Sequence, residues 1–463
     1  MKQLFIFLGF LFFNVASAQN VANKEFTYNE FLGFVKKYHP LVRNANLNID
    51  AAQADLLMAR GGFDPKIEVD YDKKQFKNQQ YYSLLTSSFK IPTWYGIEVK
   101  AGFDNAEGIY VSPENLTPNS GLTSLGISVP LGQGLFINQR MADLRKAKIN
   151  INLGQQLRKL EAIEVLYDAS VAYFLWKRTY DEVKLYETYL KNAEIRFEGI
   201  KKLIVQGDKP AIDSVEANIT LRNRKLSLED SNLKLIKSKL ELSNFLWLEN
   251  SVPLELQDEL FPETELQKTI RETIRTNDLL AVGNDLTNHP KIAALQNKID
   301  MLDIDRKFKA NMLLPRLNLS YNYLSEPTKF NDFRTEDYKV GLNFYIPIFL
   351  RKERGALRLA KIKLQESRSI FDLERVQLGN KINAQKVEIN SLERQRALVS
   401  GLTRDNQTML NSEERLFSFG ESSLFLINTR ENNLVLAQLT QIALDNRYFL
   451  SNASLFKIMA NPD

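Results

Sequence analysis

The chain has no cysteine and only two histidines among its 463 residues. The absence of cysteine excludes thiol nucleophiles, disulfide frameworks, iron–sulfur clusters and thiolate zinc sites. Two histidines leave almost no material for a histidine-based metal site or catalytic triad. We therefore expect no catalytic, cofactor or metal site, and the composition argues against an enzyme.

Long apolar runs and a strong charge imbalance are also missing. After the N-terminus, no stretch approaches the ~18 consecutive apolar residues that indicate a membrane-spanning helix. Sixty-one Lys and Arg stand against 56 Asp and Glu, so the net charge of +5 is mild and does not indicate nucleic-acid binding. Charged residues make up 25% and aromatic residues 10% of the chain, which excludes wholesale disorder.

Residues 1–18 predict a secretory signal peptide. Lys2 gives a positive start, Leu4–Phe13 is apolar, and Ala16-Ser17-Ala18 is a small-x-small cleavage site. The mature chain is then expected to begin near Gln19, and no cysteine follows for lipoprotein acylation. An uncleaved anchor is the alternative interpretation. An exported chain without spanning helices crosses a bilayer only as a β-barrel.

The sequence is duplicated. Both histidines precede a proline, in His39-Pro40 and His289-Pro290, and the two dipeptides stand in similar local contexts. Internal repeats of this kind determine the architecture of a whole chain. Further matches occur in chain order: Pro65-Lys66-Ile67 with Pro315-Arg316-Leu317, Ala147-Lys148-Ile149 with Ala360-Lys361-Ile362, Gly207 with Gly420, and Ile212-Asp213-Ser214 with Ile427-Asn428-Thr429.

Each half predicts helix, two strands, a very long helix, a turn and a further helix. A capping box at Thr27–Glu30, with Phe26 and Phe31 as a hydrophobic staple, starts the first helix. Pro40 suits the first residue of a renewed helix that runs to about Arg60. We interpret the histidines before the prolines as structural, with a functional role as the alternative.

Strict alternation of apolar and polar residues predicts strands after each first helix. It occurs in Lys66–Asp72 and from Arg316 to Tyr323, and the return strands end at Pro130 and Pro347. Alternation gives a strand one apolar and one wet face. A soluble sheet with one solvated face has the same pattern. The signal peptide and the lack of spanning helices favour an outer-membrane barrel.

The first half carries extra residues between its strands. Pro65 and Pro130 are separated by about twice as many residues as Pro315 and Pro347. The insertion, about residues 76–123, predicts a hairpin that turns near Pro92-Thr93-Trp94-Tyr95-Gly96. It either adds strands to the barrel or forms extracellular loop structure, and the sequence does not choose.

Long proline-free stretches with apolar residues at 3-4 spacing follow the strands. They predict coiled-coil-like helices at residues 139–206, 211–248, 352–419 and 426–460, and the second half also predicts a helix at 290–313. The helix over 139–206 would be ~100 Å long at 1.5 Å per residue. Four amphipathic strands are too few to close a membrane barrel, and open edges are forbidden in lipid. The chain must therefore share its barrel with other subunits.

The order of helices, strands and turns, repeated in the two halves, resembles that of the TolC-like outer-membrane efflux channels. The likeness rests on the X-Pro helix starts, Pro65 and Pro315, the Val129-Pro130-Leu131 and Ile346-Pro347-Ile348 strand ends, and the turns at Gly207 and Gly420. It implies an α+β membrane protein: a long α-helical coiled-coil barrel continuous with a transmembrane β-barrel that is shared in a homotrimer, with four core strands per chain. Expected domains are repeats at 19–248 and 282–463 around an equatorial segment at 249–281.

The resemblance also implies a function. Such a protein is a passive exit duct in the outer membrane, with a long periplasmic extension, for a tripartite efflux pump or type I secretion system. Its expected partners are outer-membrane lipid, a periplasmic adaptor and the inner-membrane transporter that supplies the energy. A periplasmic adaptor protein, or a secreted structural coiled coil or adhesin, is the alternative.

The two helix ends are the candidate aperture. The candidate residues are Gly207, Asp208, Asp213, Gly420, Glu421, Phe425, Asn428, Arg430 and Glu431. We hypothesise a constriction made by Phe425 and Asn428 packing and by an Asp213–Arg430 pair. Helix capping by Asp213 and Asn428 is the alternative.

Overall fold

The computed structural model describes residues 24–274, 286–329 and 334–460. The predicted signal peptide and the end of the predicted equatorial segment lie outside these residues. The chain forms two compact units. The first comprises Met1–His39, Ala169–Arg275 and Leu392–Leu450, and the second comprises Pro40–Asp168, Thr276–Ser391 and Ser451–Asp463. Each unit takes segments from both halves of the sequence, so the units do not coincide with the sequence repeats.

The first unit contains a small parallel sheet and an aromatic core. Strand β1 (Lys24–Phe26) pairs with β6 (Leu260–Pro262), and α1 (Tyr28–Tyr38) and α5 (Leu266–Thr273) follow them. The predicted capping box is confirmed: the Thr27 side chain accepts from the Glu30 N–H and the Glu30 carboxylate accepts from the Thr27 N–H. Buried aromatic side chains pack around α1: Tyr28, Phe31, Tyr173, Phe174 and Trp176.

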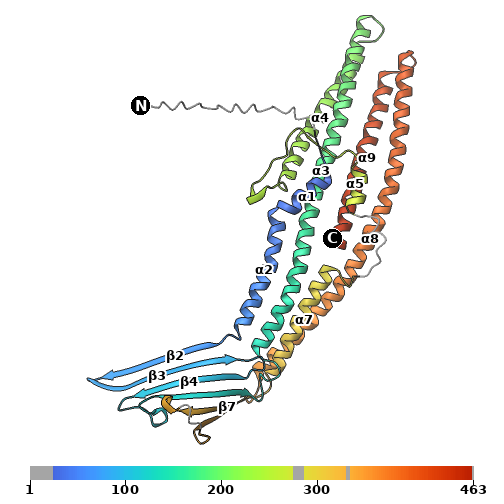
Figure 1. Cartoon of the computed structure of the whole chain (residues 1–463). Coiled ribbons are helices and arrows are strands. Elements are labelled where there is room, and N and C mark those ends of the chain that lie inside the picture. Colours follow the sequence, from blue (N-terminus) through green and yellow to red (C-terminus); the bar gives the residue numbers. More distant parts are fainter. Residues whose placement is uncertain (1–23, 275–285, 330–333, 461–463) are drawn as a thin grey trace, which may run out of the picture. The chain divides into compact units, whose positions relative to one another are not determined.

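Long helices complete the first unit. It contains the C-terminal part of α3 (Gln139–Val205), α4 (Ile212–Ser243), the C-terminal part of α8 (Arg351–Ser418) and most of α9 (Leu424–Met459). In Figure 1, α3 with α4 and α8 with α9 form two helical hairpins, each closed by a short turn.

Helix α4 ends at Ser243, five residues before the predicted end at 248. There the chain tightens, because the Phe245 N–H bonds the Leu242 carbonyl at 3.0 Å, and then reverses. The N–H of Leu254 returns to the carbonyl of Leu246 at 2.9 Å, and a short 3₁₀ helix, Glu249–Ser251, makes the turn. The apolar residues Phe245–Leu248 continue the helical pattern in sequence, so only this tertiary return reveals the stop.

The second unit contains one antiparallel sheet of six strands in the order β2-β3-β4-β5-β7-β8. The strands lie side by side in Figure 1. Their bounds are β2 Lys66–Phe76, β3 Gln79–Pro92, β4 Glu98–Glu107, β5 Leu122–Pro130, β7 Arg316–Ser325 and β8 Tyr338–Tyr345. Short 3₁₀ helices, Pro113–Asn115 and Pro327–Lys329, precede β5 and follow β7.

The inserted hairpin of the first half adds strands to the sheet. Strands β3 and β4 pair with each other and link β2 to β5 through antiparallel registers, with one register shift between Lys74 and Gln75 of β2. The four expected core strands are β2, β5, β7 and β8, and the hairpin, whose place the sequence left open, brings the described sheet to six strands. The insertion carries the same alternation as its neighbours, and this lets its backbone groups join the ladder with matched faces.

Helices flank the sheet within the second unit. Both α2 (Pro40–Gly61) and α7 (Pro290–Asn311) begin at the predicted prolines. His289 is the N-cap of α7: its Nδ1 accepts from the Lys291 N–H at 3.1 Å, and its Nε2 donates to the Ile458 carbonyl at 2.8 Å. Burial lowers the pKa of His289. The histidine is thus a neutral structural cap, as the sequence indicated.

Among the described residues, no helix is both long enough and apolar enough to cross a lipid bilayer.

Candidate functional site at the helix ends

The two long helices end in the same motif. Gly207 and Gly420 have φ angles of 81° and 78°, in the left-handed region that glycine tolerates best. The N–H of Asp208 bonds the Leu203 carbonyl at 2.9 Å, and that of Glu421 bonds the Leu416 carbonyl at 3.0 Å. Together with the glycine N–H bonds to the residue three back, these contacts make two Schellman motifs. The glycines identified in the sequence therefore close both hairpins.

A buried charged network lies behind these turns, within the first unit. Glu431 of α9 is only 1% exposed. Its two carboxylate oxygens accept from Arg196 of α3 at 2.7 Å and from Arg224 of α4 at 3.2 Å. A carboxylate this deeply buried needs such partners, because an isolated buried charge is very costly. Glu431 thereby joins three helices through charge-assisted hydrogen bonds.

Asn428 extends the network by one helical turn. Its Nδ2 donates to Glu216 Oε1 on α4 at 3.0 Å, and its Oδ1 accepts from Arg196 at 3.4 Å. Arg224 also donates to Asn432 Oδ1 at 2.6 Å. We name Arg196, Glu216, Arg224, Asn428 and Glu431 the hairpin network.

Three members of the hairpin network were not predicted: Arg196, Glu216 and Arg224. For Arg224 the sequence held a signal. Its helix buries Ala217, Leu221, Ser231, Ser238 and Leu242 at 3-4 spacing, and Arg224 falls on that same stripe. A charge on a buried stripe needs a partner, but only the packing of the other helices identifies Glu431 as that partner.

Tyr189 of α3 lines the network. Its ring lies 5.7 Å from the Arg224 guanidinium, and its hydroxyl donates to Gln438 Oε1 at 2.6 Å. Burial raises the pKa of Tyr189 to about 12. The phenol is therefore a neutral hydrogen-bond donor at physiological pH.

The predicted pair of Asp213 with Arg430 does not form. Arg430 makes its ion pair with Glu413 of α8 at 3.5 Å, and Glu413 also accepts from the Ser422 hydroxyl. The capping alternative is also wrong. Asp213 lies inside α4, whose N-cap is Ala211, and Asn428 lies inside α9, which begins at Leu424. Arg430 therefore pairs with the neighbouring helix of its own hairpin and not, as the sequence suggested, with the other hairpin.

Phe425 and Asn428 differ in exposure. Phe425 is 65% exposed on the first turn of α9, whereas Asn428 is 8% exposed and held by polar partners. Apolar side chains beneath the turns form a cluster of Ile200, Ala217 and Leu424, with Phe197, Leu203, Ile204 and Phe417 packed against it. The hairpin ends are thus firmly packed inside while Phe425 faces solvent.

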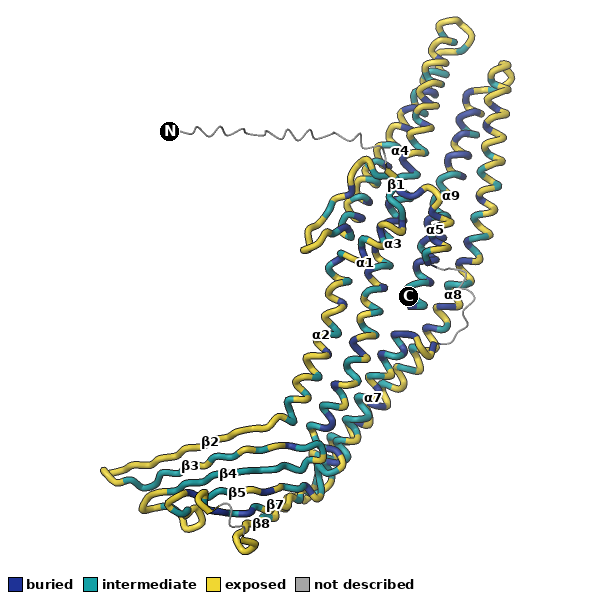
Figure 2. Tube along the Cα trace, in the orientation of Figure 1, coloured by how far each residue is buried: buried dark blue, intermediate teal, exposed yellow. Residues whose placement is uncertain are grey.

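The sheet of the second unit has two chemically different faces. One cross-strand row runs Ile67, Phe89, Ala101, Leu125, Tyr323 and Tyr338, one residue from each strand, and the next row on that face holds Ile91, Val99, Ile127, Tyr321 and Val340. The other face carries polar and charged residues. Many of the apolar side chains are exposed, among them Ile67 at 76% and Leu342 at 66%. Figure 2 shows β2 exposed along its whole length.

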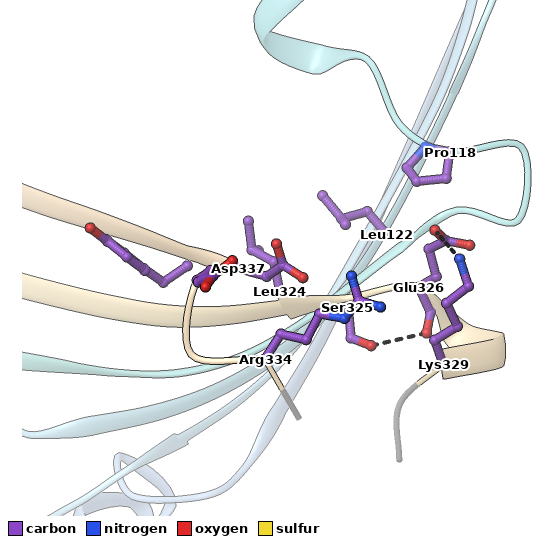
Figure 3. Close-up of a pocket in the computed structure, with 10 residues that line it drawn as sticks. Pro118, Leu122, Leu324, Ser325, Glu326, Lys329, Arg334 and Asp337 are labelled. Carbon is purple, nitrogen blue, oxygen red and sulfur yellow. Dashed lines mark hydrogen bonds and ion pairs between the residues drawn. The ribbon is translucent and has the colours of Figure 1, made fainter. Parts of the chain in front are cut away.

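A surface pocket of about 360 Å³ lies among the loops at the end of the sheet. Figure 3 shows Leu122 and Leu324 beside Ser325, Glu326 and Lys329, with Glu326 paired to Lys329 at 3.1 Å. In the described part of the chain, no group of three His, Cys, Asp or Glu residues is placed to hold a metal ion.

The second half of the chain matches a known family of sequences. The sequence model described as outer membrane efflux protein matches residues 282–461. This segment of the chain is similar to the outer membrane efflux proteins. Outer membrane efflux proteins are channels and not enzymes. Efflux channels of this kind are outer-membrane proteins with a long periplasmic helical extension. No match is found among curated proteins.

Solved structures share the fold. The CmeC outer membrane channel of Campylobacter jejuni is 14% identical, with a TM-score of 0.65 over 93% of this chain and 85% of that one. The open-state MtrE outer membrane channel of Neisseria gonorrhoeae is 12% identical, with a TM-score of 0.65 over 100% of this chain and 97% of that one. VceC of Vibrio cholerae is 12% identical, with a TM-score of 0.63 over 94% and 96%. The α+β architecture predicted from the sequence is therefore that of these channels.

Proposed function

We propose that three copies of this efflux channel close one transmembrane barrel and form a passive exit duct for a tripartite efflux pump or type I secretion system. An inner-membrane transporter supplies the energy, and a periplasmic adaptor contacts the helix ends. The observation that carries this proposal is the six-stranded sheet, whose two faces stay chemically distinct from edge to edge.

The sheet explains why one copy is incomplete. Strands β2 and β8 are its edges, and each leaves a row of backbone groups without a strand partner in the described structure. Unpaired backbone polar groups are very costly in lipid. All five pairings are antiparallel, so β8 of one copy meets β2 of the next in antiparallel orientation. The apolar face then meets lipid and the polar face lines water.

The number of strands sets the width of the barrel. Six strands from each of three copies give eighteen, whereas the four strands first expected give twelve. Barrel diameter grows roughly linearly with strand number. The inserted β3 and β4 thus widen the duct in the membrane instead of forming an external loop.

The duplicated segments define the domains of the proposed duct. We assign structural repeats to residues 19–248 and 282–463 and an equatorial segment to 249–281. Matching Schellman turns at Gly207 and Gly420, and helices that begin at Pro40 and Pro290, support the two repeats.

The hairpin ends are the proposed periplasmic aperture. Gly207, Asp208, Gly420 and Glu421 form the turns there, and exposed Phe425 is the candidate side chain for a constriction. We expect the Phe425→Ala variant to raise single-channel conductance in planar bilayers, with Leu436→Ala, a similarly exposed apolar residue further along α9, as the control. Unchanged conductance in Phe425→Ala removes the gate assignment.

Cysteine cross-linking tests the shared barrel, since the natural chain has no cysteine to interfere. Asp70→Cys on β2 is combined in turn with Lys339→Cys, Gly341→Cys or Asn343→Cys on β8, all on the polar face. Oxidation of one of these pairs in detergent is expected to yield covalent trimers on a denaturing gel.

The matched control places the first cysteine at Thr86 of β3, which faces Asp70 directly in the register but lies inside the sheet. Thr86→Cys is expected to give no cross-link with any of the β8 positions. Monomers alone from all three Asp70→Cys pairs, or ladders that extend beyond trimers, would contradict the shared three-copy barrel.

A further inference from the structure

One row of the polar sheet face is rich in lysine. Lys66 of β2 lies opposite Lys90 of β3, which lies opposite Lys100 of β4. The row continues through Gly126 and Asn322 and ends at Lys339 of β8. We name Lys66, Lys90, Lys100 and Lys339 the lysine belt. The row contains no carboxylate.

This arrangement is costly for a sheet. Directly opposite residues on neighbouring strands have Cβ atoms only ~5 Å apart, and like charges there are destabilising. Ordinary sheets offset a lysine with an opposite acid. Here three consecutive strands place lysine against lysine, so the directly opposite pairs do not stabilise the sheet.

Nearby acids compensate for only part of the belt. Glu68 pairs with Lys90. Glu98 lies 3.8 Å from Lys100 but is closer to Arg140 of α3, at 2.9 Å. Lys66 and Lys339 are exposed and make no ion pair within the described residues. The belt therefore retains uncompensated positive charge.

Apart from Glu68 and Glu98, the carboxylates of the polar face lie further along the strands. Asp70 of β2 and Asp104 of β4 both face Thr86 of β3 and so share a row. That row is four residues from the belt, or ~13 Å at 3.3 Å per residue. The separation exceeds the ~8 Å Debye length at physiological salt. The belt and the acidic row thus act as separate zones of potential.

We propose that the lysine belt binds multiply charged anions as they pass through the membrane part of the channel. The proposal rests on the shared barrel proposed above, in which the polar face lines the water-filled lumen. Three copies of the belt put twelve ammonium groups on the wall of that lumen. Ammonium groups attract phosphate and sulfonate oxygens as point charges, which suits anions of varied shape.

The test uses the full mature protein in planar bilayers, with tripolyphosphate as the probe. We expect tripolyphosphate to block the current in a voltage-dependent way. The variant Lys66→Gln/Lys90→Gln/Lys100→Gln/Lys339→Gln is expected to raise the half-blocking concentration about tenfold, because the charges that attract the anion are gone. Its reversal potential in a KCl gradient is expected to shift toward cation preference.

Two further variants keep the result interpretable. Lys66→Gln/Lys339→Gln leaves both belt ion pairs intact and is expected to raise the half-blocking concentration about threefold, which covers the case of a quadruple variant that fails to assemble. Asp70→Asn/Asp104→Asn neutralises charges on the same face and is expected not to weaken the block.

The outcomes separate the two proposals. Failure of the natural protein to form any discrete conducting channel refutes the proposed function. Discrete channels that tripolyphosphate does not block, or that it blocks equally in the natural protein and in the double-lysine variant, overturn the belt while the duct stands.

Discussion

The two halves of the chain have the same backbone turn but different side chains behind it. Gly207 and Gly420 close the hairpins with the same hydrogen bonds. Counting onward from Ile212 and Ile427, Glu216 and Glu431 take equivalent places. Glu431 is buried between two arginines, whereas Glu216 is partly exposed and accepts a single amide N–H from Asn428. The two halves therefore share the turn geometry but differ in the burial and partners of their equivalent charged residues.

Neutralising the two equivalent glutamates should sharpen this comparison most. Glu431→Gln leaves Arg196 and Arg224 without their buried carboxylate, and we expect a loss of ~3–5 kcal/mol in unfolding free energy. Glu216→Gln keeps an acceptor for Asn428, and we expect a loss of at most ~1 kcal/mol. Thermal unfolding in detergent, followed by far-ultraviolet circular dichroism, measures both. Equal losses would show that burial of Glu431 is not the deciding difference.

We expect the next largest loss of stability when a residue of the second half is replaced by its equivalent from the first half. Asp213 occupies the place equivalent to Asn428, and Asn428→Asp removes the donor to Glu216 and sets two carboxylates face to face. Arg196 offsets part of the repulsion, so we expect a loss of ~1–3 kcal/mol at neutral pH. Adding Glu216→Gln in the same chain should restore most of that stability, and a double variant no better than Asn428→Asp alone would disprove the coupling.

Because the two turns have the same geometry, we expect equal losses of stability when the turn glycine of either half is replaced. Gly207→Ala and Gly420→Ala each force an L-residue into the left-handed region, although no atom lies within 4 Å of either new Cβ. We expect each to cost ~1–2 kcal/mol from backbone strain alone. Gly199→Ala, in the interior of α3 with no atom near its Cβ, is the control and should not destabilise the chain. Clearly unequal losses at the two turns would mean that the hairpin ends are not equivalent.

We expect the smallest effect on stability from protonation of the two histidines, which makes the unfolding free energy depend on pH. Burial lowers the pKa of both His39 and His289 below the usual 6.5. Both are neutral in the folded and unfolded states well above pH 6.5. Below it the unfolded chain binds protons first, so stability falls as the pH drops toward the folded-state pKa values.

Replacing His289 with asparagine should remove part of the dependence of stability on pH. In His289→Asn the side-chain oxygen can still accept from the Lys291 N–H, so the α7 cap is kept while the titrating group is lost. We expect a flatter melting-temperature profile between pH 7.5 and about 5 for this variant. If the variant and the natural protein had the same melting-temperature profile, groups other than His289 would cause the loss of stability at low pH.

Local signals located most elements. Thr27 with Glu30, the prolines after both histidines, and the glycines at the hairpin turns each specify a backbone start or stop within a few residues of chain. These features need no distant partner, and for that reason they were predictable. The end of α4 was missed because its apolar pattern continues past Ser243, and only the return of Leu254 stops the helix.

Contacts between segments that are distant in the sequence were harder to predict from the sequence. The sequence showed that β3 and β4 form a hairpin, but whether they join the sheet depends on pairing with β2 and β5. Arg430 lies close in sequence to several candidates and binds Glu413, which only the packing of α8 against α9 selects.

By itself, the sequence determined the duplication, the long helices, the alternating strands and the chemistry that was excluded, because periodicity, caps and composition act over short stretches of chain. Only the tertiary structure decided which strands share a sheet, which arginines neutralise Glu431, and that four lysines fall in one row. Those choices depend on register and helix packing, where a shift of one residue changes every partner at once.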